Sequence, residues 1–203
     1  MKSLPRSIER LADYFSSLPG IGPKTAYRLV FHLVHSPREH ISSFAEAINA
    51  LTKDIAFCGV CRNIMSSDNT TCSICSDEKR DKSTILVVED ILDLFAFENI
   101  GTYDGTYHVL GGSISPVQGI GPDQLSIDLL TKRLKTHTEE IELIIATNPN
   151  LEGEATGMYL KKEYSHMSNI KISRLARGLP SGADLEYADF STLDKALLGR
   201  SEY

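Results

Sequence analysis

Long apolar runs are absent from this chain of 203 residues, since the longest, such as residues 85–88 and 143–146, contain four residues. A helix that spans a membrane needs about 18 or more consecutive apolar residues, so the sequence excludes one. The first residues contain no apolar stretch of the kind found in a secretory signal. Low-complexity segments and solenoid repeats are absent as well. We therefore expect a soluble, cytoplasmic protein that does not bind a membrane.

The composition is that of a folded chain. Hydrophobic residues make up 41% and charged residues 24%, which excludes an intrinsically disordered protein. A chain of this length can bury about 70% of its unfolded surface. It has room for one medium domain with small appendages.

Charge is unevenly distributed along the chain. The net charge is −6, yet residues 1–35 carry +3 and the remaining 168 residues carry −9. This asymmetry favours a basic contact region on an acidic body, and distant carboxylates are screened beyond about 8 Å at physiological salt. Chance clustering on a solvated helix pair stays open as an alternative. The basic residues of this region are Lys2, Arg6, Arg10, Lys24 and Arg28.

Apolar spacing predicts an α/β fold. Residues 5–55 repeat apolar positions at helical spacing and predict three helices, the last over residues 42–57. Residues 83–175 instead alternate between short apolar strands and helical segments. That alternation is typical of a parallel sheet covered by helices on both faces. The expected strands are residues 84–88, 107–110, 142–146 and 170–173.

A glycine-rich corner lies between the first two predicted helices. Gly20 and Gly22 permit a tight reversal with positive φ, and Pro23 suits the first position of the next helix. The free N–H groups at that helix start can hold a phosphate. Lys24 and Arg28 share one face of the helix, so the segment resembles a helix-hairpin-helix, which binds the DNA backbone without reading bases. An ordinary helical corner is the alternative.

The four cysteines form two Cys-x-x-Cys pairs separated by ten residues. Two such pairs can bring four thiolates together around one Zn²⁺. A cytoplasmic chain disfavours disulfides, and a redox dithiol needs one pair only. Four protein ligands leave no open position, so we expect a structural zinc without which this segment does not fold. The predicted ligands are Cys58, Cys61, Cys72 and Cys75.

Acidic residues follow two of the predicted strands. Glu89 and the segment after the third strand resemble the Toprim domain of topoisomerases and primases, which holds Mg²⁺ on a glutamate and an Asp-x-Asp motif. Here Asn148 and Asn150 occupy the Asp-x-Asp positions, and an amide brings no negative charge. Glu89, Glu152 and Glu154 remain as candidate ligands of a weakly held Mg²⁺ or as a partner contact. The arrangement needed for catalysis is incomplete.

Taken in chain order, these motifs resemble the bacterial RecR family of recombination mediators. Two further stretches strengthen the resemblance: residues 107–116, which run on to 119–122, and residues 174–187. No Gly-x4-Gly-Lys-Ser/Thr phosphate loop occurs, so we do not expect an ATPase. The resemblance implies four parts: a helix-hairpin-helix region, a C4 zinc finger, a Toprim-type parallel-sheet domain and a C-terminal tail in subunit contacts. Their expected bounds are residues 1–55, 56–80, 81–178 and 179–203.

The resemblance also implies a function in DNA repair and recombination without catalytic turnover. RecR proteins form ring-like homo-oligomers, here expected to be tetramers, whose hairpins line a hole that admits DNA. They act with RecO and RecF to help load RecA onto single-stranded DNA coated by SSB. By motif match, Gly20, Gly22, Lys24 and Arg28 form the DNA-binding site. Several copies facing one hole multiply the phosphate contacts of a weakly basic segment.

Two other functions stay open on the sequence alone. The first is a Mg²⁺-dependent Toprim nuclease or topoisomerase-like enzyme, in which Glu89, Glu152 and Glu154 carry the metals. The second is a protein-binding scaffold in which the glycine-rich corner contacts no DNA. Both alternatives differ from the leading prediction, which is a zinc-stabilised, non-enzymatic DNA clamp.

Overall fold

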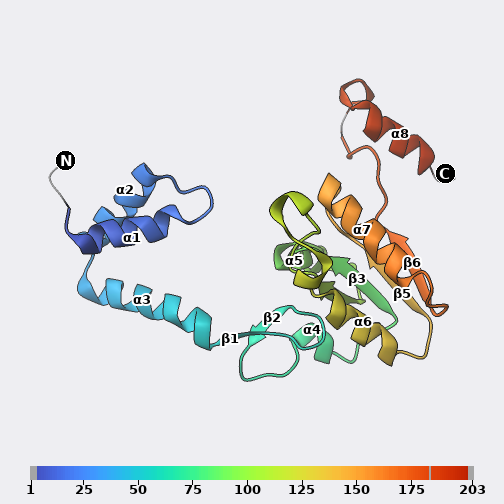
Figure 1. Cartoon of the computed structure of the whole chain (residues 1–203), viewed down its shortest axis with the longest axis horizontal. Helices are drawn as coiled ribbons and strands as arrows, with labels where there is room; N and C mark the ends of the chain where they lie inside the picture. Colours follow the sequence, from blue (N-terminus) through green and yellow to red (C-terminus); the bar gives the residue numbers. More distant parts are fainter. Residues whose placement is uncertain (1–3, 183, 201–203) are drawn as a thin grey trace. The chain divides into compact units, whose positions relative to one another are not determined.

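The computed structural model describes residues 4–182 and 184–200 (Figure 1). Lys2 of the basic segment and Ala183 of the 174–187 stretch lie outside these ranges. The chain divides into two compact units, residues 1–55 and 56–203. Among the described residues, no helix combines the length and apolar character needed to cross a membrane.

Three helices make up the first unit: α1 (Arg6–Ser16), α2 (Pro23–Val34) and α3 (Arg38–Lys53). Helices α1 and α2 pack through Ala12, Ala26 and Val30, whose small side chains allow the two backbones to approach closely. Helix α3 begins and ends earlier than predicted, because Pro37 occupies its N-cap position and residues 55–57 form a strand. None of its residues is buried, so Phe44, Ile48 and Leu51 expose apolar surface.

A small module of irregular structure opens the second unit. It contains the strands β1 (Ile55–Phe57) and β2 (Ile64–Ser66), which form a two-stranded sheet, and the short helix α4 (Ser73–Ser76). Its cysteines belong to a buried cluster that also includes Leu86 and Tyr107 of the neighbouring sheet. The module therefore shares a hydrophobic core with the sheet.

The larger sheet contains four parallel strands in the order β4-β3-β5-β6. Its strands are β3 (Thr84–Val88), β4 (Thr106–Val109), β5 (Ile141–Ile145) and β6 (Ile170–Arg174). Helices α6 (Ile127–Thr136) and α7 (Leu151–Tyr164) cover one face, whereas α5 (Ile91–Ile100) and the cysteine module cover the other. This arrangement confirms the predicted α/β fold with a parallel sheet covered on both faces.

Shorter elements complete the second unit. Three 3-10 turns, η1 (Pro116–Gln118), η2 (Pro122–Gln124) and η3 (Leu185–Tyr187), lie in the connections. Helix α8 (Phe190–Leu198) ends the described chain. The Asp189 carboxylate caps this helix by accepting bonds from the N–H groups of Ser191 and Thr192. Phe190 is 93% exposed, so α8 presents apolar surface as α3 does.

His108 is fully buried on the edge strand β4. Its Nε2 atom lies 2.9 Å from the carbonyl oxygen of Ser126. Burial disfavours the charged ring and lowers the pKa of His108 to about 4. The unfolded chain therefore binds more protons than the folded chain below the ordinary histidine pKa.

This pKa difference predicts that stability falls as the pH falls from about 6.5 towards 4. His108→Gln keeps a donor for the Ser126 carbonyl but does not titrate. Between pH 7 and pH 5 the native protein should lose about 2 kcal/mol more than this variant. Urea denaturation at the two pH values measures the difference, and equal losses would contradict the assignment.

Candidate functional site

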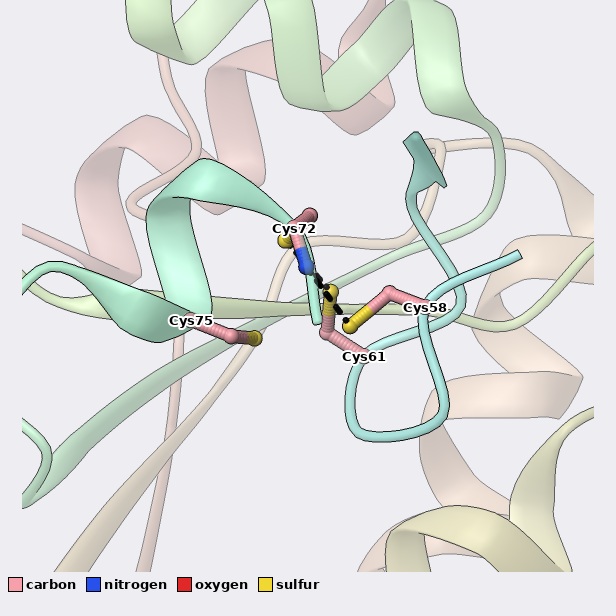
Figure 2. A group of neighbouring side chains, drawn as sticks. All are labelled: Cys58, Cys61, Cys72 and Cys75. Atoms are coloured by element: carbon pink, nitrogen blue, oxygen red, sulfur yellow. Dashed lines mark hydrogen bonds between the residues drawn. The ribbon is translucent and has the colours of Figure 1, made fainter. Parts of the chain in front are cut away.

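The four cysteines converge at one point in the second unit. Their ligand atoms all lie within 4.8 Å of one another, and three of the four residues are buried. Figure 2 shows Cys58 and Cys61 on a tight loop that faces Cys72, the N-cap residue of α4, and Cys75, the third residue of that helix. In the described residues 4–182 and 184–200, the four cysteines are the group of His, Cys, Asp or Glu side chains whose ligand atoms lie close enough together to hold one metal ion.

The backbone around the cysteines is arranged to receive negative sulfur. The N–H groups of Asn63 and Cys72 donate to the Sγ atoms of Cys61 and Cys58, each at 3.4 Å. Arg62 adopts φ 62°, a left-handed conformation that closes the first Cys-x-x-Cys loop. Hydrogen bonds from backbone N–H groups favour the thiolate form of a cysteine. The loop is therefore preorganised for thiolate ligands.

The sulfur atoms cannot all be thiolates without a cation. Cys61 and Cys72 lie 3.5 Å apart, and their hydrogen bond raises the pKa of the Cys61 thiol and lowers that of Cys72. A divalent cation removes this conflict, and its binding releases protons. Four convergent sulfur atoms suit Zn²⁺, and a full set of protein ligands leaves no position for a substrate. The four cysteines can therefore hold a metal ion with a complete set of protein ligands.

Cys72→Ser should release the metal, because an alcohol replaces one of four thiolate ligands. We expect the segment of residues 56–80 to lose its hydrogen-exchange protection, since it contains few apolar residues. Metal content by mass spectrometry of the native protein measures the loss. Ser73→Ala, in the same helical turn, is the control and should keep the metal. Full occupancy in the Cys72 variant would contradict the four-thiolate site.

The hairpin places two cations on an exposed helix start. Gly20 adopts φ +78°, and Gly22 is the N-cap residue of α2 with Pro23 after it. Gly22 has an extended backbone, so Gly20 is the one of the two glycines that adopts the positive φ of the reversal. A Cβ atom at either glycine would meet no atom within 4 Å. Lys24 and Arg28 are both exposed one turn apart, and neither has a carboxylate partner among the described residues.

Glu89, at the end of β3, is 7% exposed and already has its partners. The backbone N–H of Asn148 donates to Oε1 at 2.9 Å, and its side-chain Nδ2 donates to Oε2 at 2.7 Å. Gly153 permits this approach, because a Cβ atom there would lie 2.6 Å from the Glu89 carboxylate. An aspartate at position 148 could not donate the second bond. The Asn148 amide therefore satisfies the Glu89 carboxylate, as a metal ion would if an aspartate occupied position 148.

The other residues predicted near this site have contacts that do not involve Glu89. Asn150 caps α7, since its Oδ1 accepts from the N–H of Gly153 at 2.8 Å. Glu154 forms ion pairs with Arg174, at 3.1 Å, and with Arg177. Glu152 is half-buried in the first turn of α7. The structure therefore does not bring Glu89, Glu152 and Glu154 together as a metal-binding group.

Sequence reasoning missed the two arginines that pair with Glu154. Arg174 is the last residue of β6, and Arg177 follows three residues later. They line two adjoining cavities of about 290 and 500 Å³ at the carboxyl ends of β5 and β6. Their position at and shortly after the end of a predicted strand was the available signal, because ligand sites of parallel sheets lie at the carboxyl ends of the strands.

Asn148→Asp should destabilise the protein at neutral pH. The new carboxylate faces the buried Glu89 carboxylate and cannot donate to it, which should cost about 2–3 kcal/mol. Asn150→Asp is the matched control, because aspartate caps a helix as well as asparagine does. Denaturant unfolding of both variants measures the difference. Equal stability of the two variants would show that the amide bond to Glu89 is unimportant.

Comparison with known proteins matches three stretches of the chain to family models. Residues 83–176 match the model of the Toprim domain, residues 8–52 that of the RecR helix-hairpin-helix, and residues 178–201 that of the RecR C-terminal region. These matches define a recombination protein built on a Toprim sheet.

The full-length relatives agree with the family models. The chain is 49% identical to the recombination protein RecR of Staphylococcus aureus strains JH9, Newman and COL, over 198 residues and 98% of either chain. It therefore belongs to the RecR family of recombination and repair proteins. This confirms the resemblance found in the sequence.

Proposed function

We propose that this RecR-family protein is a DNA clamp that is stabilised by zinc and breaks no bonds. The observation that carries the proposal is the exposure of Lys24 and Arg28 at the start of α2, without a carboxylate partner among the described residues. Backbone N–H groups and a helix dipole at that start add to their attraction for phosphate. The glycines at positions 20 and 22 leave the approach open.

Each part of the chain has a role in this proposal. Residues 1–55 bind DNA, and residues 56–80 form a C4 zinc finger on Cys58, Cys61, Cys72 and Cys75. Residues 81–178 form the Toprim domain, and residues 179–203 form a tail that contacts other subunits. The soft sulfur donors support zinc as the resident ion.

The clamp acts as a ring-like homo-oligomer, and we infer a tetramer. One basic hairpin makes few phosphate contacts, whereas several hairpins around one DNA molecule raise the affinity by multivalency. Exposed apolar side chains near both ends of the chain support association of copies through these segments. They include Phe44, Ile48 and Leu51 on α3 and Phe190, Leu197 and Leu198 on α8.

The clamp works in the cytoplasm with RecO and RecF to help load RecA onto single-stranded DNA coated by SSB. Membership of the RecR family supports this assignment. The acidic character of the chain outside residues 1–35, −9 in total, fits a partner with a basic surface. Glu152, in the first turn of α7 just after β5, is a carboxylate that such a partner could contact.

A nuclease or topoisomerase function is disfavoured by the pairing of Glu89 with Asn148. Two-metal phosphoryl transfer needs several carboxylates that neutralise the metal charge. Here one candidate carboxylate is bound by an amide and another, Glu154, by two arginines. Mg²⁺ chemistry is therefore not part of the proposed function.

Replacing both Lys24 and Arg28 by Glu should abolish DNA retention in a gel shift. Removing a cation that neutralises one phosphate also reduces the slope of log K against log salt by about 0.9. Because both side chains are exposed, the circular dichroism and the thermal midpoint should stay unchanged. Lys132→Glu with Lys135→Glu, a charge-matched pair on α6, is the control and should retain DNA. Normal binding of the hairpin variant at moderate salt would refute the DNA-binding site.

A further inference from the structure

A zinc ion with four thiolate ligands carries a net charge of about −2. Burying such a charge is costly unless cations or hydrogen-bond donors compensate it. The cysteine cluster is buried, and two backbone N–H groups donate to its sulfur atoms. Neutral donors lower the cost but leave the net charge in place. The chain must therefore supply positive charge nearby.

Arg133 belongs to a helix on the other face of the sheet, but its guanidinium binds the same strand as the cysteine module. It belongs to α6, which covers the face of the sheet opposite to the cysteine module. Its Nη1 donates to the Tyr107 carbonyl oxygen at 2.7 Å, and its Nη2 donates to Thr106 Oγ1 at 2.6 Å. Both acceptors belong to β4, the edge strand of the sheet. The guanidinium therefore binds at the open edge of the sheet.

The loop that carries Cys58 and Cys61 binds the same edge of β4, two residues beyond Tyr107. The Val109 N–H donates to the carbonyl oxygen of Cys61 at 2.9 Å. In a β-strand, residues two apart direct their backbone groups to the same side, so Tyr107 and Val109 place the guanidinium and the loop next to each other. Tyr107 itself is buried in the cluster that contains Cys58, Cys61 and Cys72.

The electrostatics of Arg133 agree with this placement. Burial lowers its pKa, whereas the thiols of Cys75, Cys61 and Cys58 act in the opposite direction. No carboxylate oxygen lies within 4.0 Å of its guanidinium among the residues that the structure describes. A partly buried cation without a carboxylate partner is favoured by another source of negative charge nearby. The cysteine cluster, which shares a core with Tyr107, offers that charge once its thiols are ionised.

A second cation, Lys82, follows the cysteine module in the chain and contacts its backbone. The Nζ atom of Lys82 donates to the carbonyl oxygens of Cys75 at 3.0 Å and Asp77 at 2.6 Å. It also has no carboxylate partner in the described part of the chain. One charge from Arg133 and one from Lys82 match the charge of a zinc tetrathiolate.

We propose that Arg133 is the principal counter-charge of the metal-bound thiolates, with Lys82 as the second, and that it couples the cysteine module to helix α6. The inference rests on the proposed zinc centre but not on DNA binding. Residues that surround a metal's ligands commonly change metal affinity by about 10- to 100-fold when they are replaced. Arg133 is thus a positioning residue for the thiolates, which acts across the edge of the sheet.

Zinc affinity of the full chain tests the proposal, by competition with a chromophoric chelator. Arg133→Gln should weaken zinc binding by about 10-fold or more. Arg133→Lys keeps the charge and should stay within about threefold of the native protein. Lys135→Gln, an exposed lysine of the same helix, is the control and should change nothing. Native affinity in Arg133→Gln, or an equal loss in Arg133→Lys, would overturn the proposal.

Spectroscopy of the cobalt-substituted protein separates a charge effect from a loss of structure. A nearby cation lowers the energy of the thiolate electrons, so Arg133→Gln should shift the sulfur-to-cobalt charge-transfer band to longer wavelength. A residue that only supports the fold would leave that band in place. An unshifted band together with weaker binding would therefore contradict the counter-charge role.

Lys82→Gln provides an independent test if the Arg133 variant does not fold. It should weaken zinc binding several-fold, whereas Lys79→Gln, an exposed neighbour, should not. An unchanged affinity in Lys82→Gln would count against charge compensation. DNA retention by metal-loaded variants stays as in the native protein, so failure of the clamp function would be recognised separately.

Discussion

The second unit depends on four sulfur atoms that lie within 4.8 Å of one another. Residues 56–80 contain few apolar residues of their own, so the module packs on the sheet beside it and, in our proposal, is held together by a metal ion on the four cysteines. The bond from Val109 to Cys61 joins the module to strand β4. Loss of the metal would therefore expose both the edge of the sheet and the core that the module shares with it.

In the same sheet, two amides occupy the positions where the Toprim motif has aspartates. Asn148 satisfies both oxygens of Glu89, and Asn150 caps α7, so neither amide serves a metal ion. An amide and a carboxylate have nearly the same shape, but the amide can also donate hydrogen bonds, whereas an ionised carboxylate only accepts them. The sheet thus keeps its geometry while its acidic edge is neutralised from within. In this account the task of holding DNA belongs to the hairpin of the first unit.

Much of the fold could be predicted from the sequence, because apolar periodicity and cysteine spacing are local signals. The parallel strands and the convergence of Cys58–Cys61 with the second pair follow from them. The bounds of α3 could not be predicted, since residues 55–57 are drawn into a sheet by tertiary pairing. The partners of Glu154 and Arg133 could not be predicted for the same reason. Each partner lies on another helix or strand, which only folding brings close.

The central claim is that this protein holds the phosphate backbone by shape and charge and leaves it intact. Incubation of supercoiled plasmid with the metal-loaded protein in Mg²⁺ or Mn²⁺ tests it most directly. The account predicts that the plasmid is retained by the protein and recovered supercoiled after the protein is removed. Nicking, relaxation or religation that disappears in a Glu89→Gln variant would contradict it.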